Sequence, residues 1–253
     1  MNQLTNLQYW NQEKLGDYFP NFLYNDETKK ASTTDASGAV PIDLADLVRI
    51  HRLIRSRKSF TVMEFGVGFS TLIIADALKK NKKDWEALDS IPKIRNRHLF
   101  HCFTVDTSEH WIAVASGRFP ETLKPFVSFH HSRVEIGTHQ GQICHFYKNL
   151  PDVVPDFIYL DGPDPAAVEG SINGMTFQCN ERTVMAGDLL LMEPILLPGT
   201  FVLIDGRTNN ARFLKNNLKR DYQITWDQEG DVTTFELTEE RLGKYNLLGK
   251  DFF

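Results

Sequence analysis

A turn with two glycines separates a short apolar segment from a segment with helical periodicity. Residues 61–65 are mainly apolar, with one acid, Glu64. Gly66 and Gly68 come next, and apolar residues then recur at helical spacing from Leu72. This order predicts a strand, a tight turn and a helix. Glycine has no Cβ, so a ligand can lie against the bare backbone of the turn. The free N–H groups and positive dipole end of the helix point to the same place, which predicts a site for a nucleotide-type ligand.

Three carboxylates each stand immediately after a predicted strand. They are Asp106, Asp161 and Asp205. Such positions are suited to binding a ligand or to moving a proton at the carboxyl end of a parallel sheet. The loop 161–165 also contains prolines and a glycine, which fix its shape and leave Asp161 and Asp164 exposed. We expect a functional role for Asp161 and a solvated position for Asp164.

Predicted strands alternate with predicted helices along the chain, and this pattern is typical of an α/β fold. Strands are expected at 61–65, 101–105, 126–130, 156–160, 200–204, 222–226 and 232–237. Helices are expected at 4–19, 42–54, 72–78, 107–119, 183–191 and 208–218. The remaining segments are predicted to be loops: 25–37, a charged insertion at 79–97, a substrate lip at 170–180 and a hairpin loop at 227–231. The apolar tail 247–253 is expected to dock on the rest of the protein.

Length and composition limit the classes of protein to consider. A chain of 253 residues can form one α/β domain with extensions. The net charge of -5 gives no electrostatic case for a nucleic-acid partner. Cys102, Cys144 and Cys179 are odd in number and form no C-x-x-C pair, so neither a disulfide framework nor a structural zinc site is predicted. The polar N-terminus and the lack of a long apolar run predict a cytoplasmic protein with no membrane partner.

The run 64–70 resembles the first motif of class I S-adenosylmethionine-dependent methyltransferases. Thr71 occupies the position where a dinucleotide fingerprint has its third glycine, which disfavours a nicotinamide or flavin site. The resemblance implies a Rossmann-like three-layer sandwich with a seven-stranded, mostly parallel sheet and an antiparallel last strand. It also implies a helical extension or cap at 1–59 and a domain that binds S-adenosylmethionine at 60–253.

The same resemblance implies which residues bind the cofactor. Glu64 would lie near the amino group of the methionine part, and the glycines under its carboxylate and sulfonium. The full set is Glu64, Gly66, Gly68, Ser70, Thr71, Asp106, Thr107, Ser132, Val134 and Asp161. Ser132 and Val134 stand where the family meets adenine, although Arg133 departs from the usual residue types there.

Asp106 would accept hydrogen bonds from both ribose hydroxyls, because a carboxylate is an acceptor only. It lies 38 positions after Gly68 (106 minus 68), whereas an acid about 20 residues on is usual. Asp89 is the rival at the shorter spacing. We prefer Asp106, because a clear strand precedes it and a helix that Thr107 or Ser108 can cap follows it.

Within this family, the segment 161–163 and Asp205 favour methylation of a hydroxyl on a small molecule or sugar. The catalytic candidates are Asp161, Asp205 and His131. In one subgroup of O-methyltransferases, acids at these positions hold a magnesium-type cation that lowers the pKa of the acceptor hydroxyl. Here Gly206 stands where that subgroup has an acid or an asparagine, so magnesium is the less favoured alternative. Asp205 could instead pair with Arg207 or cap the helix at Thr208.

Two other functions are weighed against the methyltransferase. One is a nicotinamide-dependent oxidoreductase on a similar sheet, and the other is a non-catalytic module that binds a nucleotide. The expected partner is a small-molecule acceptor. A homodimer formed by the N-terminal helices is an alternative to a cap on the sheet edge.

Overall fold

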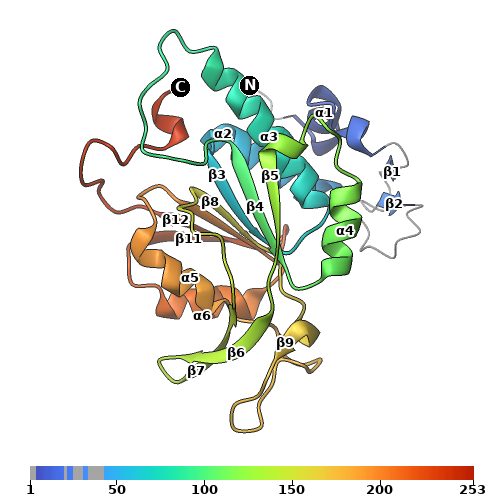
Figure 1. Ribbon diagram of the computed structural model, residues 1–253, viewed down its shortest axis with the longest axis vertical. Coiled ribbons are helices and arrows are strands. Elements are labelled where there is room, and N and C mark those ends of the chain that lie inside the picture. Colours follow the sequence, from blue (N-terminus) through green and yellow to red (C-terminus); the bar gives the residue numbers. More distant parts are fainter. Residues whose placement is uncertain (1–3, 20–21, 25–30, 34–42) are drawn as a thin grey trace.

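The computed structural model describes residues 4–19, 22–24, 31–33 and 43–253. A twisted sheet forms the middle layer of the molecule, with helices α2, α3 and α4 on one face and α5 and α6 on the other (Figure 1). Residues 25–30 and 34–37 of the predicted loop lie outside the described residues, as does the predicted start of the second helix before residue 43. Within the described part, no helix combines the length and apolar character needed to cross a bilayer.

The main sheet has seven strands in the order β11-β12-β10-β8-β3-β4-β5. Their bounds are β3 (Thr61–Phe65), β4 (His101–Asp106), β5 (Val127–His131), β8 (Phe157–Leu160), β10 (Phe201–Asp205), β11 (Tyr222–Asp227) and β12 (Val232–Leu237). The five strands from β10 to β5 are parallel, and β12 runs antiparallel to both of its neighbours. The predicted three-layer α/β fold with an antiparallel last strand is therefore confirmed.

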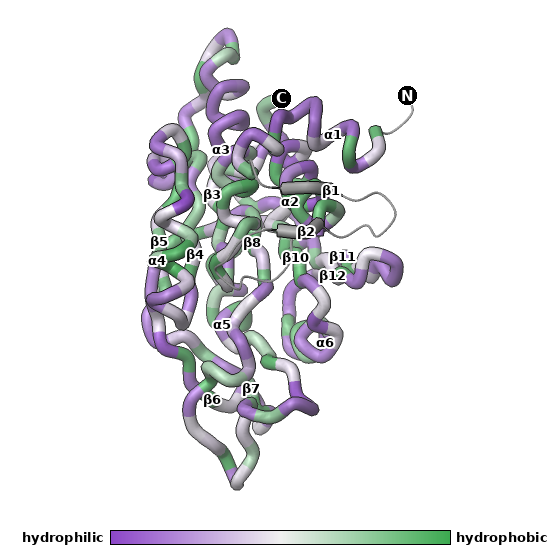
Figure 2. Tube along the Cα trace, turned by 90° about the vertical axis from the view of Figure 1, so that its right-hand side faces the viewer, coloured by the Kyte–Doolittle hydropathy of each residue, from purple (hydrophilic) through white to green (hydrophobic). Residues whose placement is uncertain are grey.

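Burial on both faces explains why the central strands are almost continuously apolar. Every residue of β3 is buried, and its alternate side chains enter two different cores. Val62 packs with the cluster under α2 and α3, whereas Met63 packs with the cluster under α5 and α6. Figure 2 shows hydrophobic residues gathered along the central strands.

The described helices are α1 (Asn6–Gln12), α2 (Leu44–Arg57), α3 (Phe69–Glu86), α4 (Glu109–Gly117), α5 (Gly187–Met192) and α6 (Thr208–Asn217). Local capping sets the start of several of them. Asp43 accepts a hydrogen bond from the Ala45 amide at the start of α2, and Ser108 caps α4 through the Trp111 amide. The predicted helix at 183–191 begins four residues later, at Gly187 (187 minus 183).

The prediction that residues 79–97 form a loop is wrong for the first part of that segment. Helix α3 continues to Glu86, because Trp85 is buried and its ring packs edge-on against Phe60 at 5.1 Å. The ring of Phe252 also packs edge-on against Trp85, at 5.2 Å, so the C-terminal tail docks here as expected. Charged residues dominate this stretch because its other side faces solvent.

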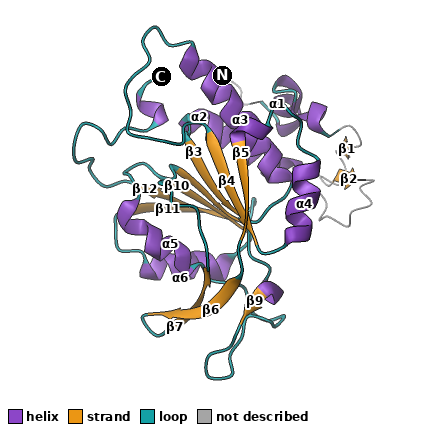
Figure 3. Cartoon of the chain, viewed as in Figure 1, coloured by secondary structure: helices purple, strands orange, loops and turns teal. Residues whose placement is uncertain are grey.

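A second, three-stranded sheet was not predicted. It consists of β6 (Val134–His139), β7 (Gln142–Tyr147) and β9 (Val168–Glu169), in the order β7-β6-β9, and it lies beyond the main sheet (Figure 3). The β6–β7 turn is formed by Gln140 and Gly141, both with positive φ, which is the conformation of a tight hairpin turn. The short hairpin of β1 (Phe22–Tyr24) and β2 (Ala31–Thr33) was also missed.

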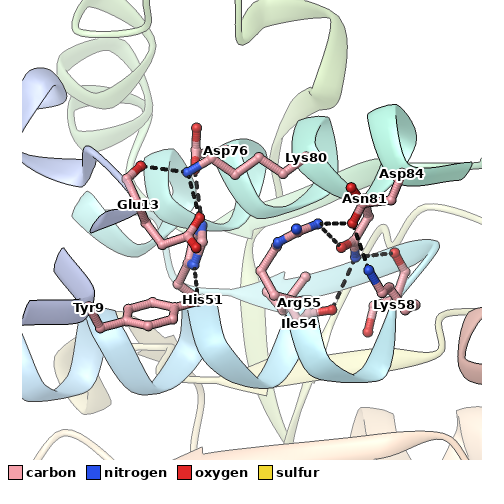
Figure 4. Close-up of polar contacts among 11 residues, drawn as sticks. Tyr9, Glu13, His51, Ile54, Arg55, Lys58, Asp76, Lys80, Asn81 and Asp84 are labelled. Carbon is pink, nitrogen blue, oxygen red and sulfur yellow. Dashed lines mark hydrogen bonds and ion pairs between the residues drawn. The ribbon is translucent and has the colours of Figure 1, made fainter. Parts of the chain in front are cut away.

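A buried polar network joins α1, α2 and α3 (Figure 4). Asp76 is only 3% exposed, and it accepts hydrogen bonds from Tyr18 Oη (2.7 Å) and His51 Nε2 (3.0 Å) and pairs with Lys80 Nζ (2.7 Å). Burial lowers the pKa of His51, so the ring is neutral and its Nδ1 accepts from the Tyr9 hydroxyl at 2.7 Å. The N-terminal segment is thereby anchored on the two helices. The predicted boundary at residues 59 and 60 stays a prediction.

Replacing Asp76 with alanine should destabilise the fold strongly. The change leaves the buried His51 Nε2 and the Tyr18 hydroxyl without their acceptor, while Lys80 keeps its pair with Glu13, and we expect the free energy of unfolding to fall by about 2–4 kcal/mol. Glu86→Ala removes an exposed pair with Lys82 on the same helix and should cost about 0.5 kcal/mol or less. Urea unfolding of the two variants measures both values. Equal losses would contradict a structural role for the network.

Candidate active site

Two glycine-containing turns lie against each other at the carboxyl edge of the sheet. Gly66 has a φ of +101°, and a Cβ added to it would come within 3.0 Å of the Gly162 amide nitrogen. A Cβ at Gly162 would lie only 2.8 Å from the Gly66 nitrogen. The Asp161 amide also donates to the Phe65 carbonyl at 3.0 Å. The turn after β3 and the loop after β8 therefore form one rigid unit, and both glycines are needed for the close approach.

Gly68, unlike Gly66, is not packed against another backbone segment of the described chain. Among the described residues, the only atom within 4 Å of a Cβ built on Gly68, outside its chain neighbours, is Ser70 Oγ at 3.8 Å, and Gly68 lines a cleft. Its bare backbone thus faces open space at the first turn of α3, where helix amides point outward. This is the part of the turn where a ligand can approach the chain.

Glu64 is fully buried and holds the start of α3. Its carboxylate accepts hydrogen bonds from Ser70 Oγ (2.6 Å) and Thr71 Oγ1 (2.7 Å). Burial raises the pKa of Glu64 to about 7, although the hydroxyl donors act in the opposite direction. Thr71 Oγ1 also accepts from the Gly68 amide at 3.2 Å. The residue that replaces the third glycine of a dinucleotide site therefore ties the turn to the helix.

Asp106 joins the turns that follow β3 and β4. Its Oδ2 accepts from the Val67 amide (2.9 Å), and its Oδ1 accepts from the Ser108 amide (2.7 Å). A carboxylate offers about four lone-pair sites, so acceptor capacity remains for a ligand. Its rival Asp89 is exposed in the loop between α3 and β4, and that loop leads to the opposite edge of the sheet.

A cleft of about 530 Å³ opens beside the first turn of α3, between α2 and α4. The ends of β8 and β10 form its floor. The residues that give it its chemical character are Gly68, Phe69, Trp111, Tyr159, Asp161 and Asp205. The cleft therefore combines bare backbone, aromatic surface and carboxylates, as expected for a site that takes a polar organic ligand.

Asp161, Asp205 and Asp46 hold protons more tightly than isolated carboxylates. Asp161 is exposed to solvent in the cleft, but desolvation by the surrounding protein raises its pKa to about 7; Arg207 lowers it, and the nearby Asp205 and Asp46 raise it further. Asp205 accepts a hydrogen bond from Tyr159 Oη at 2.8 Å, and burial raises its pKa against that hydrogen bond. Burial, reinforced by Asp205, also raises the pKa of Asp46 to about 6. A group that titrates near neutral pH can serve as a general base.

Arg207 fixes the loop that carries Asp161. Its guanidinium donates to the Pro163 carbonyl at 3.0 Å and to the Asp161 carbonyl. Among the described residues no hydrogen bond or ion pair joins Asp205 to Arg207, although the charge of Arg207 partly offsets the burial that raises the pKa of Asp205; Arg207, and not Asp205, occupies the N-cap position of α6. Asp205 instead accepts a hydrogen bond from Tyr159, and no local sequence pattern indicates that contact.

The other predicted residues follow Asp106 along the same edge. His131 Nε2 lies 3.1 Å from the Thr107 carbonyl, and its ring does not line the cleft. Ser132 is buried and its amide donates to the Asp106 carbonyl at 3.0 Å, whereas Val134 is fully buried at the start of β6. The structure thus brings Asp161 and Asp205 into one cleft but leaves His131 outside it. The ligand-binding and catalytic roles of all these residues stay predictions.

The arrangement does not fit a magnesium site. The described residues contain no group of three or more His, Cys, Asp or Glu side chains that could hold a metal ion. Gly206 supplies no side chain at the position where a third hard donor would be expected after Asp205. We therefore derive no step through a metal.

Several cleft residues were not predicted to have a role, among them Asp46, Phe69, Trp111 and Tyr159. Asp46 could have been found, because Asp43, Asp46 and Ile50 share one face of a helix at i, i+3 and i+7. Tyr159 could not, because it lies within an apolar strand and only the strand pairing places it beside Asp205.

No family model matches the sequence, and no curated protein matches it. Among solved structures, the O-methyltransferase TomG from Streptomyces achromogenes, in complex with SAM, is 14% identical with a TM-score of 0.44; the match covers 94% of this chain and 92% of that chain. An O-methyltransferase from Bacillus cereus in complex with SAH is 13% identical, covers 93% and 92%, and has a TM-score of 0.42. An RNA methyltransferase from Salinibacter ruber, in complex with S-adenosyl-L-homocysteine, is 15% identical, covers 81% and 99%, and has a TM-score of 0.36. The fold assigned above rests on the strand order of this chain.

Glu64→Gln should remove part of the pH dependence of stability. The folded-state pKa of about 7 lies above the unfolded value of 4.5, so the contribution of Glu64 is fully present below about pH 4.5 and is lost as the pH rises through 7. Between pH 4.5 and 8, the wild type should lose about 3 kcal/mol more unfolding free energy than the variant. Urea unfolding across this range measures the difference. Exposed Glu109→Gln is the control, and parallel curves for wild type and Glu64→Gln would contradict the argument.

Proposed function

We propose that this chain is an S-adenosylmethionine-dependent methyltransferase that methylates a hydroxyl of a small molecule or sugar. The observation that carries the proposal is the cleft at the first turn of α3, where the bare backbone of Gly68 faces the carboxylates of Asp161 and Asp205. The sheet order with a reversed β12, and the resemblance of residues 64–70 to the first motif of the family, support it.

The cofactor would bind at the carboxyl edge between Asp106 and Gly68. S-adenosylmethionine supplies an electrophilic methyl group on a sulfonium. The remaining acceptor capacity of Asp106 suits two ribose hydroxyls, and the first-turn amides of α3 suit a carboxylate. Trp111 adds aromatic surface to the same cleft.

The acceptor would lie between α2 and the loop after β8. Asp161 has a pKa of about 7 and can take the proton of an acceptor hydroxyl near neutral pH. Arg207 and the contact between Gly66 and Gly162 hold the backbone of Asp161 in place, which favours a fixed alignment of the acceptor. Tyr159 orients Asp205 beside it.

The two alternative functions differ from the methyltransferase in the ligand they would bind or in whether they turn it over. A nicotinamide-dependent oxidoreductase would retain NAD, and a non-catalytic module would bind a nucleotide without turnover. The acidic net charge of -5 supports a small-molecule acceptor over nucleic acid. The proposed location of the protein is the cytoplasm.

Calorimetric titration with S-adenosylhomocysteine, beside NAD, tests the cofactor class. We expect micromolar-range binding of the first and none of the second. Asp106→Ala should weaken binding at least tenfold, because it removes the ribose acceptor, whereas the matched Asp89→Ala should leave it unchanged. Circular dichroism checks that both variants fold. Binding of NAD alone, or equal binding by Asp106→Ala and wild type, would contradict the proposal.

Asp161→Asn should lower methyl transfer by about 100-fold, because a neutral amide cannot take the acceptor proton. In the wild type the rate should rise as the pH passes through about 7, and this rise should be absent in the variant. Asp164 also lines the cleft, but its carboxylate accepts from the Ala166 amide in its own turn, so Asp164→Asn should stay within about twofold of wild type. Rates with a panel of hydroxyl acceptors, with and without magnesium, measure these effects. Full activity of Asp161→Asn would rule out its role as the base.

A further inference from the structure

Strand β11 is an edge strand whose outer side has no partner among the described residues. The Thr238 amide donates to the Asp221 carbonyl at 2.8 Å, which fixes which backbone groups face β12. Because backbone groups alternate along an antiparallel strand, Tyr222, Ile224 and Trp226 direct their N–H and C=O groups away from β12. These groups form a ready template for another strand.

Ile224 and Trp226 expose apolar side chains on this strand, whereas Tyr222 is half-buried and packs on Phe235. Trp226 is 58% exposed and Ile224 is 36% exposed, and both lie on the same face of the strand as Tyr222. A large aromatic side chain is unusual on a free edge, where charged residues and proline normally prevent pairing. The opposite edge strand, β5, has no exposed large hydrophobic residue in the described part of the chain.

Opposite charges flank the two ends of β11. Lys219 precedes the strand and Glu229 follows it, and both are exposed. Neither side chain forms an ion pair with another described residue. A strand with one charge at each end is complementary to a second copy of itself in the antiparallel direction.

We propose that β11 pairs antiparallel with β11 of a second copy of this chain, with Ile224 opposite Ile224. This register is the one in which the outward groups of both strands meet over the full length, and three pairs that each exchange two bonds give about six hydrogen bonds. Tyr222 then lies opposite Trp226, and Lys219 opposite Glu229. The two main sheets join into one continuous sheet across a twofold axis, in an isologous dimer.

Like charges also meet twice in this register, because Asp221 of each copy lies opposite Asp227 of the other. The carboxylate of Asp227 is already engaged, because it accepts hydrogen bonds from the Glu229 and Gly230 amides (both 3.1 Å) in its own turn. The Asp221–Asp227 contact is therefore weaker than the attraction at the strand ends. The proposal is independent of the function proposed above, because β11 does not line the cleft.

Sedimentation velocity over a range of concentrations tests the proposal. We expect a species of twice the chain mass of 29.0 kDa at micromolar concentration. Ile224→Pro removes an outward N–H and no bond to β12, so it should raise the dimer dissociation constant at least tenfold. Lys93→Glu, in the exposed loop before β4, is the control and should leave the constant unchanged. A monomer at every concentration, or a dimer unaffected by Ile224→Pro, would overturn the proposal.

A charge exchange tests the register without altering the backbone. Lys219→Glu and Glu229→Lys each place like charges opposite each other twice in the dimer, and each should weaken it about threefold to tenfold. The double variant restores opposite charges and should return the dissociation constant to the wild-type value. A double variant that is weaker than both single variants would overturn pairing centred on Ile224.

Discussion

The contact between the turn after β3 and the loop after β8 is the constraint on which the candidate site depends. Two backbones meet there so closely that neither Gly66 nor Gly162 has room for a Cβ. The contact fixes Asp161 relative to the first turn of α3, and Arg207 ties the same loop from the side of β10. The cleft is therefore shaped by main-chain contacts rather than by flexible side chains, which suits a reaction that requires aligned reactants.

Electrostatics at this edge follow from the same geometry. Parallel strands bring their carboxyl ends together. Several of those ends carry acids here, and their carboxylates are partly desolvated. Crowding and burial raise the pKa of Asp46 and Asp161 into the neutral range, so a carboxylate that is normally fully ionised becomes able to exchange a proton. Burial raises the pKa of Glu64 too, but this side chain accepts hydrogen bonds from hydroxyl groups of helix α3 and thereby holds that helix.

Local sequence patterns predicted most of the main sheet, because a strand buried on both faces must be apolar and must end at a turn. They failed where the reason for a structure lay elsewhere in the chain. Residues 79–86 look like a polar loop, yet they are helical because Trp85 packs against Phe60 and Phe252. The hairpin of β6 and β7 was missed because its turn, Gln140 and Gly141, is a weak signal without its partner strand β9.

The sequence by itself determined the α/β fold, the glycine turn after β3 and the acids after the strands, since each depends on residue type and local periodicity. Only the tertiary structure decided that Asp161 and Asp205 share a cleft while His131 does not, and that Glu64 is a buried support for α3. It also showed that Tyr159, and not Arg207, holds Asp205. These outcomes depend on distances between residues far apart in the chain, which strand pairing and helix packing set and which no local pattern encodes.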